Sequence, residues 1–200
     1  MKPDILIPTC KTDWDISPMI GELFSVDHDP NVFYSCFEEG SAAINRNRCL
    51  SMATATIVIM ADDDMTGFFP GWAEKHVAPF EKDENIIQVA ARLLNTDGTY
   101  GAMMGDTKDY TTPLVEVPLA PSACIAFRND GTRFWEEYLG SGFEDTDFIF
   151  QLKEKYPKGK IFVNNEVRLI HTHEMKNQNK YFEHNKAIFT RRFPNARFEL

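Results

Sequence analysis

The sequence predicts an α/β domain with a mostly parallel central sheet and helices on both faces. Apolar runs rich in β-branched residues, such as residues 57–61, have the composition of strands that are buried on both faces. Predicted strands and helices alternate over the first 92 residues, which favours parallel strands joined by crossover helices. The chain has 200 residues and 43% hydrophobic content, enough for one core, so we expect a single domain over residues 1–200.

The predicted elements follow one another in a regular order. The expected strands cover residues 4–8, 31–37, 57–61, 86–92, 114–117, 123–128 and 160–164. The expected helices cover residues 17–25, 41–52, 72–79, 132–139 and 148–156, with a last helix that ends near residue 192.

Particular residues justify the boundaries of these elements. Pro8 is expected to stop the first strand. Ser17 suits the N-cap of the first helix and Pro18 its first position. Ser41 can cap the second helix in the same way. Pro79 is expected to end the third helix, because proline disrupts helical hydrogen bonding.

Composition and charge restrict the partners and the compartment. A net charge of −9 disfavours binding of the whole surface to nucleic acid or to an anionic membrane. Residues 171–200 nevertheless carry +3, which either neutralises the acidic remainder of the domain or leaves open a phosphate-bearing partner such as DNA. Four cysteines without metal or redox spacing fit a reducing compartment, and no apolar run is long enough to span a membrane. We therefore expect a cytoplasmic protein.

Three consecutive carboxylates follow the apolar run at 57–61. Asp62, Asp63 and Asp64 would lie at the C-terminal end of that strand, where open α/β sheets bind ligands. Because the carboxylates repel one another, they need a counter-charge, and oxygen ligands suit Mg²⁺ or Mn²⁺. A solvated acidic turn or a helix N-cap is the alternative interpretation.

Two residues far along the chain extend this site. His171 follows a late strand, and Asp62, Asp64 and His171 together would make an open Mn²⁺ site with positions left for a diphosphate. His173 lies two positions on, shares the same face and remains the alternative ligand. Asp145 follows the G-S-G segment at 140–142 and can accept a proton from an incoming hydroxyl. Helix-dipole stabilisation, about 0.3–1 kcal/mol for each acid, is the structural alternative for that acidic cluster.

Several segments, in order, resemble one enzyme family. They are D-I-L-I-P-T-C at 4–10, I-N-R-N-R-C-L at 44–50, I-V-I-M-A-D-D-D-M at 57–65, P-G-W at 70–72 and G-F-E-D-T-D-F-I-F-Q-L at 142–152. The sequence is similar to glycosyltransferases of the GT-A fold, close to the inverting family-2 pattern with its D-x-D motif. R-L-I-H-T-H at 168–173 resembles the metal-binding histidine segment of the β-1,4-galactosyltransferase group.

The resemblance implies an activity and a division of the domain. It implies a hexosyl- or pentosyltransferase that depends on Mn²⁺ or Mg²⁺ and inverts the sugar in a single displacement. The donor would be a UDP- or GDP-sugar, bound by a nucleotide-binding half of about residues 1–98. Residues 99–200 would form the acceptor side, and the acceptor would be a glycan, a lipid-linked sugar, another hydroxyl compound or a modified DNA base.

The resemblance also implies roles for individual residues. Asp64 would be the chief carboxylate ligand of the metal, Asp62 would contact the metal or the ribose, and His171 would be the imidazole ligand. Asp145 would be the catalytic base. The implied donor contacts are Thr9, Cys10, Arg46, Asp62 and Asp63. Glu144 would bind acceptor hydroxyls, and Trp135, near the glycine-rich loop, is a candidate for stacking on a sugar.

The sequence departs from the family pattern at several places, among them Arg168 where some relatives have another metal ligand, and it leaves other functions open. The second nucleotide-side aspartate is missing in its usual form, and Asp27 and the pair Glu38-Glu39 are both candidates. Gln151 stands where family members usually have arginine. The alternative functions are a nucleotidyltransferase, a non-catalytic sugar-nucleotide-binding module and a metal hydrolase. The first is disfavoured because the loop at 9–15 contains no glycine.

Overall fold

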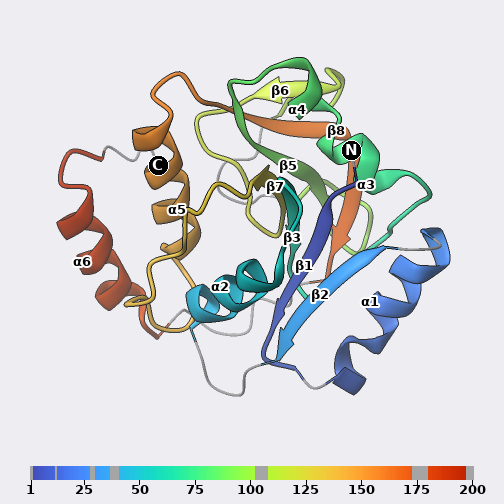
Figure 1. The fold of residues 1–200 in the computed structure, drawn as a ribbon, viewed down its shortest axis with the longest axis horizontal. Helices are drawn as coiled ribbons and strands as arrows, with labels where there is room; N and C mark the ends of the chain where they lie inside the picture. Colours follow the sequence, from blue (N-terminus) through green and yellow to red (C-terminus); the bar gives the residue numbers. More distant parts are fainter. Residues whose placement is uncertain are drawn as a thin grey trace.

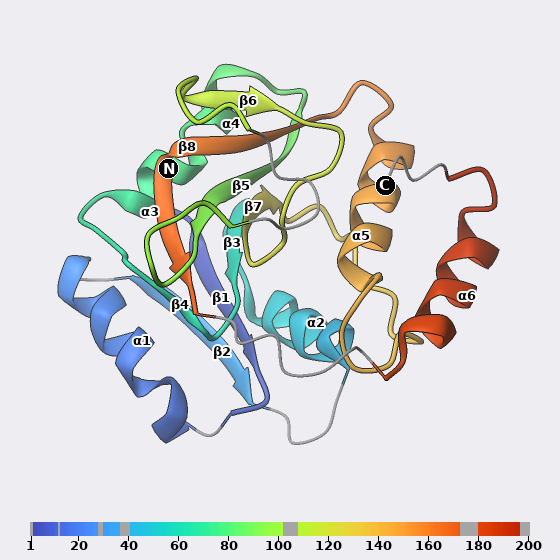
Figure 2. The same ribbon diagram turned by 180° about the vertical axis from the view of Figure 1, so that it is seen from behind.

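The strands and helices lie in a computed structural model that describes residues 2–11, 13–27, 30–36, 41–101, 108–172 and 180–196 (Figures 1 and 2). The strands are β1 (Asp4–Thr9), β2 (Asn31–Cys36), β3 (Ile57–Ala61), β4 (Met65–Thr66), β5 (Ile86–Leu94), β6 (Leu114–Glu116), β7 (Cys124–Arg128) and β8 (Lys160–His171). The helices are α1 (Asp13–Val26), α2 (Ala42–Met52), α3 (Trp72–Val77), α4 (Pro79–Lys82), α5 (Glu144–Lys155) and α6 (Phe182–Arg192).

These strands form one mixed sheet in the order β2-β1-β3-β7-β5-β8-β4, with β6 also paired to β8. β1 is parallel to β2 and β3, and β5 is parallel to β8. β7 is antiparallel to both β3 and β5, so β1, β2, β3, β5 and β8 all run in one direction. The predicted α/β class with a mostly parallel sheet is therefore confirmed.

Helices cover both faces of the sheet. Along β1, Ile5 and Ile7 belong to a core that includes Leu23 of α1 and Trp72 of α3, whereas Leu6 faces a second core. That second core includes residues of α2 and α5, and Figure 1 shows these two helices on the side of the sheet away from α1 and α3. Because both faces are covered, the strands read along the sequence as uninterrupted apolar runs. Each large side chain so buried stabilises the fold by about 1.5–3 kcal/mol.

Some predicted boundaries are confirmed and others are wrong. The hydroxyl of Ser41 accepts a hydrogen bond from the amide of Ile44 at 3.2 Å, so the predicted cap of α2 is confirmed. β1 continues through Pro8 to Thr9. α1 begins at Asp13, which places Pro18 inside the helix. Pro79 begins the short helix α4 where we expected only an end. A proline in the sequence suggests that a strand or helix ends nearby, but the packing of its apolar residues against the core determines where the element ends.

The helix expected at 132–139 is absent, and a side chain from α2 binds the backbone of this segment. Asn47 accepts a hydrogen bond from the amide of Phe134 at 2.9 Å and donates one to its carbonyl oxygen at 2.8 Å. In a helix over 132–139 the carbonyl oxygen of Phe134 would instead accept from the amide of Tyr138, whereas its amide, in the first turn, would have no internal partner. Phe134 and Tyr138 are buried from this irregular segment.

The C-terminal part of the described chain packs as a separate unit on the edge of the domain. α6 lies outside α5 in both views, and it is held by a small apolar cluster of Tyr138, Ile188, Phe189 and Phe193. Arg192 joins it to α5 through the carboxylate of Asp147 at 2.5 Å. In the described part of the chain, no helix has the length and apolar character needed to cross a lipid bilayer.

Candidate active site

The pairing of β4 with the end of β8 brings the aspartates at 62–64 close to His171. The amide of Asp62 donates to the carbonyl oxygen of Ala123 at 2.7 Å, after which the chain turns into β4. β4 pairs antiparallel with the end of β8, with Met65 opposite His171. The amide and hydroxyl of Thr172 both donate to the carbonyl oxygen of Asp64, at 3.0 and 2.7 Å. Backbone pairing therefore holds Asp64 beside His171.

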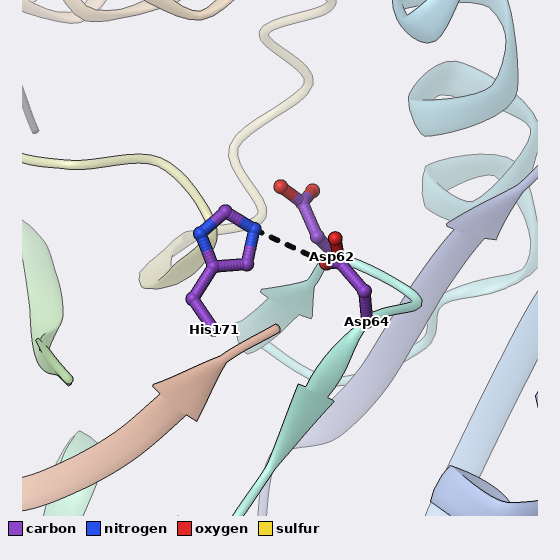
Figure 3. A group of neighbouring side chains, drawn as sticks. All are labelled: Asp62, Asp64 and His171. Carbon is purple, nitrogen blue, oxygen red and sulfur yellow. Dashed lines mark ion pairs between the residues drawn. The ribbon is translucent and has the colours of Figure 1, made fainter. Parts of the chain in front are cut away.

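Asp62, Asp64 and His171 form a compact group of possible metal ligands. One ligand atom from each lies within 4.8 Å of the others, and Figure 3 shows the three side chains converging. The Nε2 atom of His171 is 3.1 Å from Oδ1 of Asp64. Two carboxylates and an imidazole are a donor set that fits Mn²⁺ and, less closely, Mg²⁺. His173 lies outside the described residues, so the choice between the two histidines rests on this placement of His171 alone.

The electrostatics of the group favour a bound cation. Burial raises the pKa of Asp62, and the neighbouring charge of Asp64 raises it further, against Arg46 and His171. Burial lowers the pKa of His171, but the hydrogen bond and negative charge of Asp64 outweigh it, so that this pKa is raised. A cation among these atoms would relieve the repulsion between the two carboxylates.

The group opens into a cleft of about 550 Å³, a volume that suits a small-molecule ligand. Its lining includes five carboxylates, one guanidinium and one imidazole. The lining residues are Pro8, Thr9, Cys10, Ala42, Asn45, Arg46, Asp62, Asp63, Asp64, Ser122, Gly140, Ser141, Gly142, Glu144, Asp145 and His171. The cleft thus contains every predicted site residue except Trp135. Its excess of negative charge would repel a nucleoside diphosphate unless a cation accompanied it.

Asp63 is turned toward the first strand and away from the metal-ligand group. Its carboxylate accepts a hydrogen bond from the hydroxyl of Thr9 and lies 2.8 Å from the ammonium group of Lys11. Thr9 in turn accepts a bond from the amide of Lys11 at 2.8 Å. Asp63 therefore orders the loop after β1, and Thr9 and Cys10 line the cleft from that loop.

Arg46 lies deeper than the resemblance implied. Its side chain is buried, with Nη1 2.5 Å from Oε1 of Glu144 and Nη2 3.3 Å from Oδ1 of Asp62. Burial alone would lower its pKa, but the charges of Glu144, Asp62 and Asp145 together raise it, so the guanidinium is charged. Its nitrogens are engaged by protein carboxylates on two sides of the cleft.

The segment at 142–152 begins α5 with an unusual backbone. Gly142 and Phe143 have φ values of 107° and 71°, and such a left-handed conformation costs a bulky residue about 1–3 kcal/mol. The turn lets the amide of Gly142 donate to the carboxylate of Glu144. Burial raises the pKa of Glu144 to about 7, although the attraction of Arg46 opposes the change.

Asp145 is half-buried and faces the cleft. Its Oδ2 accepts a hydrogen bond from the hydroxyl of Ser122 at 2.6 Å, and its Oδ1 accepts one from the amide of Thr146 at 2.7 Å. Sequence analysis missed Ser122, which stands in the irregular segment before β7 without any motif around it. It also missed Asn45, whose neighbour Arg46 was the only indication in the sequence. The buried Oδ1 of Asn45 has no hydrogen-bond partner among the described residues.

Trp135 lies outside the cleft. Its side chain is 37% exposed, and the guanidinium of Arg192 stacks on its ring, with Cζ 3.6 Å from the ring centroid. One face of the indole is thus covered by the protein itself. The open part of the ring borders a surface depression that also includes Asn47, Glu136 and Glu137.

The departures from the family pattern have different outcomes. Asp27 follows α1 and does not line the cleft, whereas Glu38 and Glu39 lie outside the described residues. Gln151 donates to the carboxylate of Asp147 at 2.7 Å, on the same carboxylate that Arg192 contacts. The guanidinium of Arg192, on α6, therefore lies beside Asp147, close to Gln151, the position where family members usually have arginine.

Comparisons with solved structures support the fold. TarS 1–349 from S. aureus, in complex with UDP-GlcNAc, has a TM-score of 0.66 at 17% identity, over 100% of this chain and 68% of that one. GalNAc-T7 with UDP, GalNAc and Mn²⁺ has a TM-score of 0.63 at 14% identity, over 94% of this chain and 41% of that one. At these identities the likeness shows the GT-A fold and no more. No curated protein matched the chain.

A family comparison identifies the chain. The description "Glycosyl transferase family 2" matches residues 17–143, which run from α1 through the acidic motif to the turn before α5. That span is more than half of the chain. The protein belongs to glycosyl transferase family 2.

Proposed function

We propose that this protein is a Mn²⁺- or Mg²⁺-dependent inverting glycosyltransferase that moves a sugar from a nucleotide-diphosphate sugar to an acceptor hydroxyl. The observation that carries the proposal is that one cleft holds both Asp145 and the group of Asp62, Asp64 and His171. Solved neighbours hold UDP-GlcNAc or UDP with Mn²⁺, which favours a UDP-linked donor over a GDP-linked one. When bound by Asp62, Asp64 and His171, the cation would offset negative charge on the departing diphosphate.

The residues of the chain suit a single displacement. The acceptor oxygen would attack the anomeric carbon while the bond from that carbon to the diphosphate oxygen breaks, and the nucleoside diphosphate would leave. Asp145 would take the proton of the acceptor hydroxyl, with Ser122 and the amide of Thr146 orienting its carboxylate. One displacement from the face opposite the leaving group inverts the anomeric configuration. Thr9 and Cys10 would contribute to the donor side and Glu144 to the acceptor side.

The acceptor is proposed only by class. A glycan, a lipid-linked sugar, another hydroxyl compound or a modified DNA base all offer the hydroxyl that Asp145 would deprotonate. Trp135 lies outside the cleft, so a sugar stacked on it would belong to an acceptor that extends beyond the reacting residue. We therefore expect replacement of Trp135 to lower the rate of transfer to an extended acceptor and to leave transfer to water or to a monosaccharide unchanged.

The proposed activity can be tested by measuring sugar release from a panel of UDP- and GDP-sugars, with Mn²⁺ and with a chelator. We expect turnover of at least one donor that depends on the cation. Asp145→Asn should lower this cation-dependent sugar release by about 10²- to 10⁴-fold while donor binding persists, because the shape of the side chain is kept and the base is lost. Glu154→Gln, at an exposed position on the same helix, is the matched control.

The same experiment separates the alternatives. A non-catalytic binding module would bind a donor and show no turnover in either protein. A metal hydrolase would act on substrates without a nucleotide-sugar donor, and a nucleotidyltransferase would release pyrophosphate from a nucleoside triphosphate. Absence of cation-dependent binding and turnover for every donor would contradict the proposal.

A further inference from the structure

We propose that Arg46 is a positioning residue that sets the distance between the cation side and the acceptor side of the cleft. This inference rests on the proposed function, because it assigns a role within that site. The resemblance implied a donor contact for Arg46, but both ends of its guanidinium are engaged by protein carboxylates. One partner, Asp62, belongs to the metal-ligand group, and the other, Glu144, precedes Asp145 on α5.

The bridge joins segments that are far apart in the chain. Arg46 is separated from Asp62 by 16 positions and from Glu144 by 98 positions. Nη1 and Nη2 face different carboxylates, which a planar guanidinium with its fork of donors permits. A lysine ammonium is a single centre on a flexible stem, so it cannot hold both carboxylates in the same geometry.

Each member of the bridge, Asp62, Arg46 and Glu144, makes further contacts that fix its position. The ring of Phe134 lies 5.3 Å from Cζ of Arg46, and the amide of Ala42, at the start of α2, donates to the carbonyl oxygen of Gly140 at 2.7 Å. The second carboxylate oxygen of Glu144 accepts from the amide of Gly142. The amide of Asp62 is bonded to Ala123 at 2.7 Å. Because its members are held by these further contacts, the bridge fixes the distance between Asp62 and Glu144.

Burial of these charges is a poor source of stability. The Arg46 and Glu144 side chains are 8% and 3% exposed, and removing ions from water costs free energy that their mutual attraction only partly returns. What the pair does contribute is geometry, since a charged pair with fixed donors has few alternative arrangements. In a displacement reaction, an error of about 1 Å in the placement of reacting groups can cost about 100-fold in rate. The spacing between Asp62 and Asp145 is therefore the property that Arg46 controls.

The test compares Arg46→Lys, Glu144→Gln and the double variant with the wild-type protein. The probe is the UDP- or GDP-sugar that the wild type turns over: its Kd in the presence of Mn²⁺ is measured by calorimetry, and kcat is measured as the release of its sugar. We expect Arg46→Lys to lower kcat about 30-fold or more and to change the donor Kd less than about 3-fold. The double variant should be no slower than the slower single variant, because either change breaks the same bridge. Arg48→Lys, at an exposed position on the same helix, should stay within about 2-fold of wild type.

Three results would overturn the inference. A rise in donor Kd with kcat unchanged in Arg46→Lys would make Arg46 a direct donor ligand, and additive losses in the double variant would remove the coupling. Glu144→Gln keeps the shape of the side chain and tests the bridge from its other end. A urea-unfolding cycle on the same four proteins, without donor, tests the bridge independently of activity. Additive midpoint shifts there would overturn the bridge, whereas a wild-type protein without donor turnover would overturn only the proposed function.

Discussion

His76 is a buried imidazole that no hydrogen bond stabilises in the described structure. Neither ring nitrogen has a partner among the described residues, and the side chain packs near Trp72 on α3, with ring centroids 6.4 Å apart. Burial lowers the pKa of His76 to about 3. The native protein therefore keeps this side chain neutral at pH values where an unfolded chain protonates it.

This shift predicts a loss of stability in acid. Between the native pKa and the unfolded value of about 6.5, the unfolded state binds the extra proton, so the free energy of unfolding falls as the pH falls. The contribution of His76 is about 1.4 kcal/mol for each pH unit. Urea unfolding of the wild type and of His76→Leu at pH 7 and pH 5 measures it. The variant should lose less stability between the two pH values, and equal losses would contradict the assignment.

The segment between β7 and α5 shows how one side chain decides the structure of an element. Residues 132–139 contain no helix, and Asn47 donates to the carbonyl oxygen of Phe134, which a helix would pair with a later amide, while accepting from its amide. The same asparagine also donates to the carboxylate of Glu136 at 2.8 Å. Helix prediction failed here because it used local pattern alone, whereas the competing hydrogen bonds come from a residue 87 positions earlier.

Removal of the two hydrogen bonds between Asn47 and the backbone of Phe134 should destabilise the domain. Asn47→Ala leaves the amide and carbonyl of Phe134 without their partner, and we expect a loss of about 1–3 kcal/mol in the free energy of unfolding. The ring of Phe134 lies under Arg46, so a decrease in transfer activity should accompany the loss. Asn195→Ala, at an exposed position after α6, should change stability by less than about 0.5 kcal/mol. A loss of that small size in Asn47→Ala would show that water replaces the asparagine.

Long elements with strong apolar runs were predictable, and their exact limits were not. β3 and β5 were predicted from residues that prove to be buried on both faces. β8 continues without a break to His171, whereas sequence analysis expected a strand that ended at residue 164. The extension depends on pairing with β5 and β4 beyond a register shift near Ala91, and no local pattern records such pairing.

At the scale of the whole molecule, part of the site could be predicted from the sequence, because the ends of the strands in the sheet determine where its residues lie. Asp62 and Asp64 were predictable because a buried strand must end somewhere polar, and the histidine because its segment resembles a known one. The pairing of β4 with β8 then places His171 beside Asp64. The bridge of Arg46 and the position of Trp135 depend on the packing of α2, α5 and α6, and periodicity within one element does not contain that information.

The central claim is that Asp62, Asp64 and His171 hold a divalent cation through which an acidic cleft accepts a nucleoside diphosphate. The most direct measurement is a calorimetric titration of UDP, and of GDP as the alternative, into the protein with Mn²⁺ and with a chelator. We predict that one of them binds only with Mn²⁺, and that Asp64→Ala abolishes this binding while the protein stays folded. Equal affinity in the chelator, or unchanged Mn²⁺-dependent binding in Asp64→Ala, would contradict the claim.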